Sequence, residues 1–184
     1  MSRTGEFHFT SVDVALTGMF SAVWIVVNLT LGPLSFSLTG LPVLHSFGIF
    51  FTLLLVAWVT GRFGASSMAG IIGSVFSILL GAIYLVVICF AVSAVVFDLM
   101  LLSVHHKIRL TWNSLIITAI VTMVSSYLAG ILIARFSMGT GLEYAFTVWG
   151  VWALVGGILA LVITLPIITA LERANVRNIK GDID

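Results

Sequence analysis

Aromatic and polar side chains gather near the ends of the long apolar runs that dominate this sequence of 184 residues. Aromatic walls with a few polar anchors are typical of a small-molecule pocket, and one carboxylate among the rings suits a flat ligand that carries an amine or a cation. The residues that we expect to line such a pocket are Asn28, Ser35, Phe36, His45, Tyr84, Tyr127, Glu143, Tyr144, Trp149 and Trp152. Two alternatives stay open. Aromatic rings near the ends of apolar runs also form belts at the membrane–water interface, and a lone carboxylate is often a solvated loop charge.

Asp98 is an ionisable residue inside an apolar run, where a charge is costly unless it is paired or faces the protein interior. Its nearest candidate partners in sequence are His105, His106 and Arg109, so a structural ion pair is the first interpretation and a proton relay or gate the second. Adjacent histidines on a helix point about 100° apart, so His105 and His106 are not expected to bind a metal. Cys89 is the only cysteine and reads as a small buried apolar side chain.

The sequence has no nucleophile–base–acid set, no phosphate-binding glycine loop and no haem attachment motif. We therefore expect a protein that is not an enzyme and that needs no cofactor or metal.

Composition decides the class of protein. Hydrophobic residues make up 60% of the chain and charged residues only 8%, whereas about a quarter of the residues in a soluble domain are charged. Runs without any Asp, Glu, Lys or Arg are each longer than the roughly 20 residues that cross a bilayer. They are Val14–Gly61, Phe63–Phe97, Leu110–Ala134 and Tyr144–Leu171. This pattern predicts a multi-pass protein of the cell membrane, and a net charge of +1 argues against nucleic acid as a partner.

We predict an all-α membrane protein in which six transmembrane helices form one compact bundle and one domain. The expected spans are residues 12–28, 43–60, 65–80, 83–104, 112–134 and 146–171, followed by a polar cytoplasmic tail at 172–184. Gly32-Pro33 and Gly40-Leu41-Pro42 are helix breakers, so Leu29–Leu41 is expected as an uncharged loop that folds back over the helix ends.

The distribution of cations orients the predicted bundle. With six spans and a cytoplasmic N-terminus, both termini are cytoplasmic and only Arg135 of the 8 Lys and Arg residues lies outside. The pocket residues then lie toward the outer side. The cations placed inside are Arg3, Arg62, Lys107, Arg109, Arg173, Arg177 and Lys180.

Small residues recur at helical spacing on two of the expected spans. The first stripe is Ser11, Ala15, Gly18 and Ala22; the second is Ala65, Ala69, Gly73 and Ser77, with Ser66, Gly70 and Ser74 beside it. In lipid, small side chains let helix backbones approach closely and so favour association. Either stripe is compatible with packing inside the bundle or with docking of a partner protein.

Taken together, these features resemble the substrate-binding S components of energy-coupling-factor (ECF) vitamin transporters. The resemblance rests on the size, the six apolar spans, the first small-residue stripe, the segment Gly32-Pro33-Leu34-Ser35-Phe36 and the turn Gly61-Arg62-Phe63-Gly64-Ala65. The resemblance extends over most of the chain, and the motifs that carry it are short and of low specificity.

The resemblance implies that the chain captures a vitamin or vitamin precursor from outside under the segment joining the first two spans. It also implies docking through Ala15, Gly18 and Ala22 on a transmembrane coupling protein that two cytoplasmic ATPases drive. Within the family, the chain most resembles subunits that handle thiamine or its hydroxymethylpyrimidine precursor, although Gly18 stands where alanine is usual. The alternative function is a structural or accessory subunit of a larger membrane complex with no ligand of its own. A membrane enzyme or a channel is a further alternative.

Overall fold

The computed structural model describes residues 9–104, 108 and 111–174, and every regular element in these ranges is helical. The α-helices are α1 (Ser11–Thr39), α2 (Val43–Thr60), α3 (Ala65–Leu79), α4 (Tyr84–Leu101), α5 (Trp112–Leu132), α6 (Leu142–Tyr144) and α7 (Val151–Arg173). A 3-10 turn at Leu102–Val104 follows α4, and π-helical segments at Ile133–Ser137 and Ala145–Gly150 extend α5 and join α6 to α7. The predicted all-α class is confirmed.

Five helical segments are long and apolar enough to cross a membrane, as expected for an integral membrane protein. They are Ser11–Thr39, Val43–Thr60, Tyr84–Leu101, Trp112–Ser137 and Leu142–Arg173. The predicted third span is present as α3, but it has only 15 residues. At a rise of 1.5 Å per residue, α3 is about 22 Å long, which is shorter than the roughly 30 Å hydrocarbon core of a bilayer.

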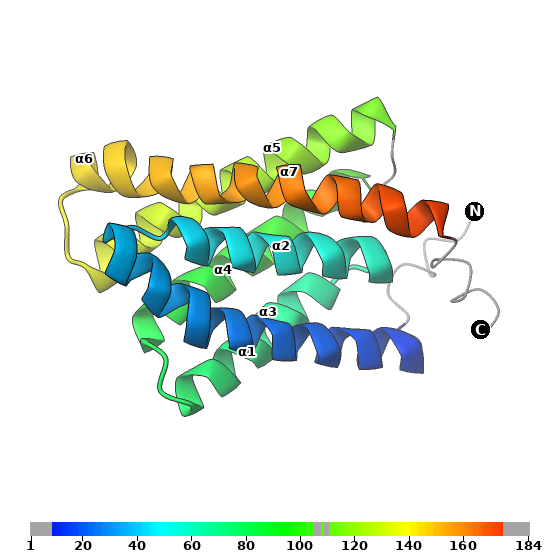
Figure 1. Ribbon diagram of the computed structural model, residues 1–184, viewed down its shortest axis with the longest axis horizontal. Helices are drawn as coiled ribbons and strands as arrows, with labels where there is room; N and C mark the ends of the chain where they lie inside the picture. The colour runs from blue at the N-terminus through cyan, green and yellow to red at the C-terminus, as the bar shows by residue number, and fades with distance from the viewer. Residues whose placement is uncertain (1–8, 105–107, 109–110, 175–184) are drawn as a thin grey trace.

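The long helices run back and forth along one axis, so the start of α1 (blue) and the end of α7 (red) lie at the same end of the bundle (Figure 1). The turns from α1 to α2 and from α3 to α4 lie at the opposite end. α2 lies in the middle and contacts α1, α3, α4, α5 and α7. The architecture therefore has two distinct ends, one with the described chain ends and the α2–α3 turn, and one with the α1–α2 and α3–α4 turns.

The first helix continues eleven residues past its predicted end at Asn28, so the expected loop over Leu29–Leu41 is wrong for all but its last two residues. Pro33 lies inside α1, and Gly40 ends the helix with a left-handed φ of 68°. Proline is tolerated in membrane helices because neighbouring groups satisfy the backbone groups that it frees. An apolar segment in lipid gains more from internal backbone hydrogen bonds than it loses at one proline, which explains the error.

The ends of the other predicted spans agree closely with the structure, except at the last one. Its helix begins at Leu142 rather than residue 146 and ends at Arg173, so Glu172 belongs to the helix and not to the predicted tail. The carboxylate of Glu172 accepts a hydrogen bond of 3.1 Å from the indole Nε1 of Trp58, which joins α7 to α2. The remainder of the predicted tail, from residue 175, lies outside the described residues.

Trp24 of α1 is the centre of the packing between α1, α3 and α4. Its side chain is fully buried, and a Cβ added to Gly73 would lie 2.6 Å from its ring. A Cβ on Gly70 would lie 2.7 Å from the Cβ of Ala94 on α4. All residues of the small-residue stripe on α3 are buried, so its role is packing inside the bundle.

Candidate ligand-binding cavity

A cavity of about 420 Å³ lies at the end of the bundle that carries the α1–α2 and α3–α4 turns. The last turns of α1, the start of α2, the α3–α4 turn and the first turns of α4 form its walls. Its lining residues are Asn28, Leu29, Gly32, Pro33, Phe36, His45, Gly81, Ala82, Ile83, Val86, Val87 and Met138. The described lining contains no Asp, Glu, Lys or Arg, so this is an apolar, uncharged cavity of a size that suits a small molecule.

Asn28 and His45 are the polar side chains of this lining, and they are bonded to each other. The distance from His45 Nε2 to Asn28 Oδ1 is 3.0 Å, and Asn28 Nδ2 donates to the Trp24 carbonyl at 2.9 Å. Both residues are almost fully buried, with relative exposures of 3% for Asn28 and 2% for His45. The pair links α1 to α2, so burial and hydrogen bonding fix the position of the imidazole in the cavity wall.

Aromatic rings hold His45 on two further sides. The ring of Phe90 on α4 lies 4.4 Å from the imidazole, centroid to centroid, and the ring of Phe36 on α1 lies edge-on at 6.2 Å. Trp149 stands behind Phe36 at 6.1 Å and is itself buried. The imidazole is therefore rigidly placed, and Phe36 supplies the aromatic part of the cavity wall.

The structure brings three of the predicted pocket residues, Asn28, Phe36 and His45, to the same cavity. Ser35 is buried beside them but serves the turn between α1 and α2. Its Oγ donates to the Leu41 carbonyl at 2.7 Å and accepts from the Leu44 amide at 3.0 Å.

The other predicted pocket residues do not reach this cavity. Tyr84 and Trp152 are 58% and 44% exposed on the outside of the helices, and Glu143 and Tyr144 are exposed at the start of the last helical segment. Tyr127 is half-buried and donates to the Phe146 carbonyl at 3.1 Å. The carboxylate and most of the rings of the expected aromatic box therefore lie elsewhere.

Most of the cavity wall is made by residues that the sequence did not single out as ligands. Gly32 and Pro33 are expected in a loop, and Gly81-Ala82 falls between the expected spans at 65–80 and 83–104. Ile83, Val86 and Val87 are aliphatic and carry no signal of a site in a chain that is 60% hydrophobic. The sequence signal for this wall is the two glycine-containing pairs that line it, Gly32-Pro33 and Gly81-Ala82.

Asp98 lies at the end of the bundle opposite to the cavity, where its carboxylate accepts hydrogen bonds from the start of α3. Its Oδ2 accepts hydrogen bonds from the Gly64 amide at 2.9 Å, the Ser67 amide at 3.1 Å and the Ser67 hydroxyl at 2.8 Å. A carboxylate at a helix N-terminus satisfies free amide groups and interacts favourably with the helix dipole. The interactions described are therefore structural; the expected partners His105, His106 and Arg109 lie outside the described residues.

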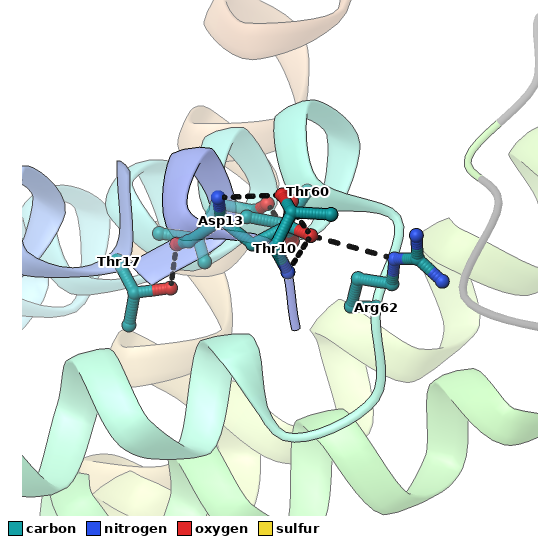
Figure 2. A network of polar contacts seen from close by, with 6 residues as sticks. Thr10, Asp13, Thr17, Thr60 and Arg62 are labelled. Atoms are coloured by element: carbon teal, nitrogen blue, oxygen red, sulfur yellow. Dashed lines mark hydrogen bonds and ion pairs between the residues drawn. The ribbon is translucent and has the colours of Figure 1, made fainter. Parts of the chain in front are cut away.

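A second buried carboxylate, Asp13, holds the same α2–α3 turn to the start of α1 (Figure 2). Asp13 forms a capping box with Thr10, and its Oδ2 lies 3.5 Å from Nε of Arg62. Thr17 donates to the Asp13 carbonyl at 2.7 Å, one turn further along α1. The two carboxylates thus attach the Gly61–Gly64 turn to α1 and to α4.

In the described part of the chain, no group of three or more His, Cys, Asp and Glu side chains is placed to hold a metal ion. The chain matches no protein-family model, and no curated protein and no solved structure is similar to it.

Proposed function

We propose that the protein is the ligand-capturing subunit of a membrane transporter of the energy-coupling-factor type. The observation that carries the proposal is the cavity of about 420 Å³, whose apolar wall contains one fixed polar pair, Asn28 and His45. An apolar cavity with few convergent polar groups is the usual form of a small-molecule site. The ligand in this proposal is a vitamin or vitamin precursor of the size of thiamine or its hydroxymethylpyrimidine part.

The proposed topology has six spans with both termini in the cytoplasm. The α2–α3 turn, which contains Arg62, and the end of α7, which contains Arg173, lie at the end with the described chain ends (Figure 1). The segment Ile133–Ser137, which contains Arg135, lies toward the end with the cavity. Because cytoplasmic loops are rich in Lys and Arg, this distribution supports a cavity that faces the outer side. In this topology α3 crosses as a short helix, packed by its small residues between α1 and α4.

The outer face of α1 is the proposed docking surface for a transmembrane coupling protein driven by two cytoplasmic ATPases. Ala15, Gly18 and Ala22 are exposed on this face, and no described atom lies within 4 Å of the position of a Cβ on Gly18. Small exposed residues at this spacing allow a second helix to approach closely in lipid.

The same exposed face favours a second candidate function, that of a structural or accessory subunit of a larger membrane complex. In that case the surface around Gly18 mediates permanent assembly and the cavity holds no ligand. Ligand binding distinguishes the two functions.

The experiment is to purify the protein, identify co-purifying small molecules by mass spectrometry, and titrate it with vitamins while following tryptophan fluorescence. The panel contains hydroxymethylpyrimidine, thiamine, biotin and riboflavin. Trp149 packs against Phe36 of the cavity wall, so a ligand in the cavity is expected to change the emission. Binding below micromolar concentration supports the proposal; no binding by any member in several detergents overturns it in favour of the accessory role.

A further inference from the structure

The cavity lies beyond the end of the short helix α3, which packs between α1 and α4. α1 and α3 run in the same direction along the bundle (Figure 1). α3 ends six residues past Gly73, which packs on Trp24, whereas α1 continues fifteen residues past Trp24. At a rise of 1.5 Å per residue, α1 thus runs about 13 Å further than α3. The described lining contains residues of α1, α4 and the α3–α4 turn and none of α3 itself, so the cavity occupies the space that the missing turns of α3 leave.

An exposed rim surrounds the buried floor of this cavity. The floor residues, which are buried, are Asn28, Gly32, His45, Val86 and Val87. The rim residues, which line the cavity and are also exposed, are Leu29, Pro33, Gly81, Ile83 and Met138. Leu29 on α1 and Ile83 on the α3–α4 turn lie on the two sides of the space left by α3, and we call the opening between them the mouth of the cavity.

The mouth lies at the depth of the lipid chains. α2 and α4 have 18 residues each. Their length of about 27 Å is close to the roughly 30 Å of the hydrocarbon core. With both helices centred in the core, His45 and Val87 lie about 8–10 Å from the midplane, inside the half-thickness of about 15 Å. The hydrogen bond from His45 to Asn28 places Asn28, and Leu29 next to it, at the same level. The mouth therefore faces acyl chains.

The path from the mouth to the floor is apolar. Each rim residue is apolar or glycine, and the described lining contains no Asp, Glu, Lys or Arg. The polar side chains of the floor, Asn28 and His45, are bonded to each other. A charged molecule finds no counter-charge on this path, and an unpaired charge is costly at this depth. A molecule that is already dissolved in lipid meets no such cost.

From the missing turns of α3, the exposed apolar rim and the depth of the mouth, we infer that the ligand is an uncharged, fat-soluble molecule that enters the cavity sideways from the bilayer. In the proposed topology it enters from the outer leaflet. The inference rests on the proposed function, because it names the class of vitamin or precursor that the same cavity captures. It favours fat-soluble compounds over thiamine, whose cationic ring stays in water.

The route is tested with two photoactivated carbene probes on the full chain in phosphatidylcholine vesicles. One probe is an iodophenyl diazirine, which is uncharged and dissolves in lipid; the other is the matching benzoate diazirine, an anion that stays in water. The uncharged probe is expected to label Val86 and Val87 of the floor, as mapped by mass spectrometry of peptides. Leu53 and Leu54 are fully buried away from the cavity and are the internal control that neither probe should label.

Two variants close the mouth from its two sides. Leu29→Trp and Ile83→Trp are each expected to reduce labelling of the floor by at least about fivefold, because a large ring fills the opening and closely packed atoms leave no passage. Val26→Trp is the matched control, since Val26 is exposed on α1 but does not line the cavity. Unfolding by SDS titration shows whether each variant keeps the wild-type fold.

The class of ligand is tested by calorimetric titration of the purified protein. Menadione, an uncharged fat-soluble vitamin precursor, is added to the panel of hydroxymethylpyrimidine, thiamine, biotin and riboflavin. Menadione is expected to bind at least about tenfold more tightly than thiamine, because the apolar cavity gives a cation no partner.

The outcomes separate the inference from the proposed function. Labelling of lipid-exposed residues without the floor contradicts the sideways route, and so does floor labelling that persists in a folded Leu29→Trp or Ile83→Trp variant. Equal labelling of the floor by the anionic probe shows an opening to water and contradicts it as well. Tighter binding of a water-soluble member of the panel than of menadione contradicts the fat-soluble ligand while it supports the proposed function. If menadione and the whole panel fail to bind, the proposed function fails, and the class of ligand fails with it.

Discussion

Two stripes of small residues with the same helical spacing lie on α1 and α3, and they face in opposite directions. On α3 the stripe points into the bundle, where Gly73 approaches the ring of Trp24 so closely that a Cβ would lie 2.6 Å away. On α1 the stripe points outward, and no described atom lies within 4 Å of a Cβ on Gly18. One stripe already has its partner and the other has none in the described chain.

The difference comes from the residues on the other faces of the two helices. The inner face of α1 carries Trp24, a large ring that needs a surface without side chains opposite it. The outer face of α3 carries large apolar residues such as Ile71, Val75 and Phe76, which are exposed and suited to lipid. A small-residue stripe therefore marks a close approach between helices, and the bulky residue that fills it identifies the partner.

The largest effect is expected for Gly73→Leu. The substitution places a branched side chain where even a Cβ is too close to Trp24, and overpacking of this degree costs about 3 kcal/mol or more. Unfolding by SDS titration in mixed micelles measures the loss. Gly141→Leu is the control and should remain near the wild type; a Gly73→Leu variant of wild-type stability would show that α3 does not pack on Trp24.

Removing the carboxylate that binds the start of α3 has the next largest effect. Asp98→Ala deletes three hydrogen bonds from the half-buried Gly64 and Ser67 and leaves their donors without this acceptor, at a cost of about 2 kcal/mol. Asp98→Asn keeps one acceptor oxygen and should lose about half as much. The same SDS titration checks both variants, and equal losses would mean that the carboxylate charge, and not the hydrogen bonding, stabilises α3.

The contact between the α3 stripe and α1 is measured by a double-mutant cycle. As a single substitution, Gly73→Ala should destabilise the protein. In the double variant, Trp24→Leu should create space that accommodates the added methyl group. The coupling free energy between the two sites is expected to be about 1 kcal/mol in the compensating direction. Additive effects would place Gly73 and Trp24 out of contact.

The helical class and most helix ends could be predicted from the sequence, because uncharged runs bounded by glycine or charge leave little choice in lipid. The end of α1 could not, since Gly32-Pro33 is a helix breaker in water and only an apolar environment carries a helix through it to Thr39. The boundaries of α3 were predicted to within one residue. Its crossing of the membrane could not be predicted, because a helix of 15 residues is shorter than the hydrocarbon core of a bilayer.

The cavity was predictable only in its polar pair, Asn28 and His45, and in the ring of Phe36. Asn28 and His45 stand out as polar residues flanking an apolar segment, and the structure places them in one hydrogen bond. The exposed positions of Tyr84, Trp152 and Glu143 depend on the rotation of each helix, which composition and spacing do not determine. Aliphatic wall residues are indistinguishable in sequence from those that face lipid.

The smallest effect on stability is expected on the α1 stripe, and it gives the sharpest contrast with α3. Gly18→Leu adds a side chain to an open surface, so the free energy of unfolding should change by less than about 0.5 kcal/mol and ligand affinity should stay at the wild-type value. If this face docks on a coupling protein, the same variant should reduce ligand uptake in cells by at least about tenfold, because helices cannot approach over a leucine as over a glycine.

Uptake of a radiolabelled ligand and binding by the purified variant are measured in parallel, with Val26→Leu as the control, since Val26 is exposed on α1 beyond the small residues. Loss of uptake with intact binding assigns the outward stripe to coupling, in contrast to the inward stripe, where the equivalent change destabilises the fold. Uptake that persists in Gly18→Leu removes the docking role from α1. Loss of ligand binding in the same variant would instead show that Gly18 supports the cavity, and the two stripes would then both serve the inside of the molecule.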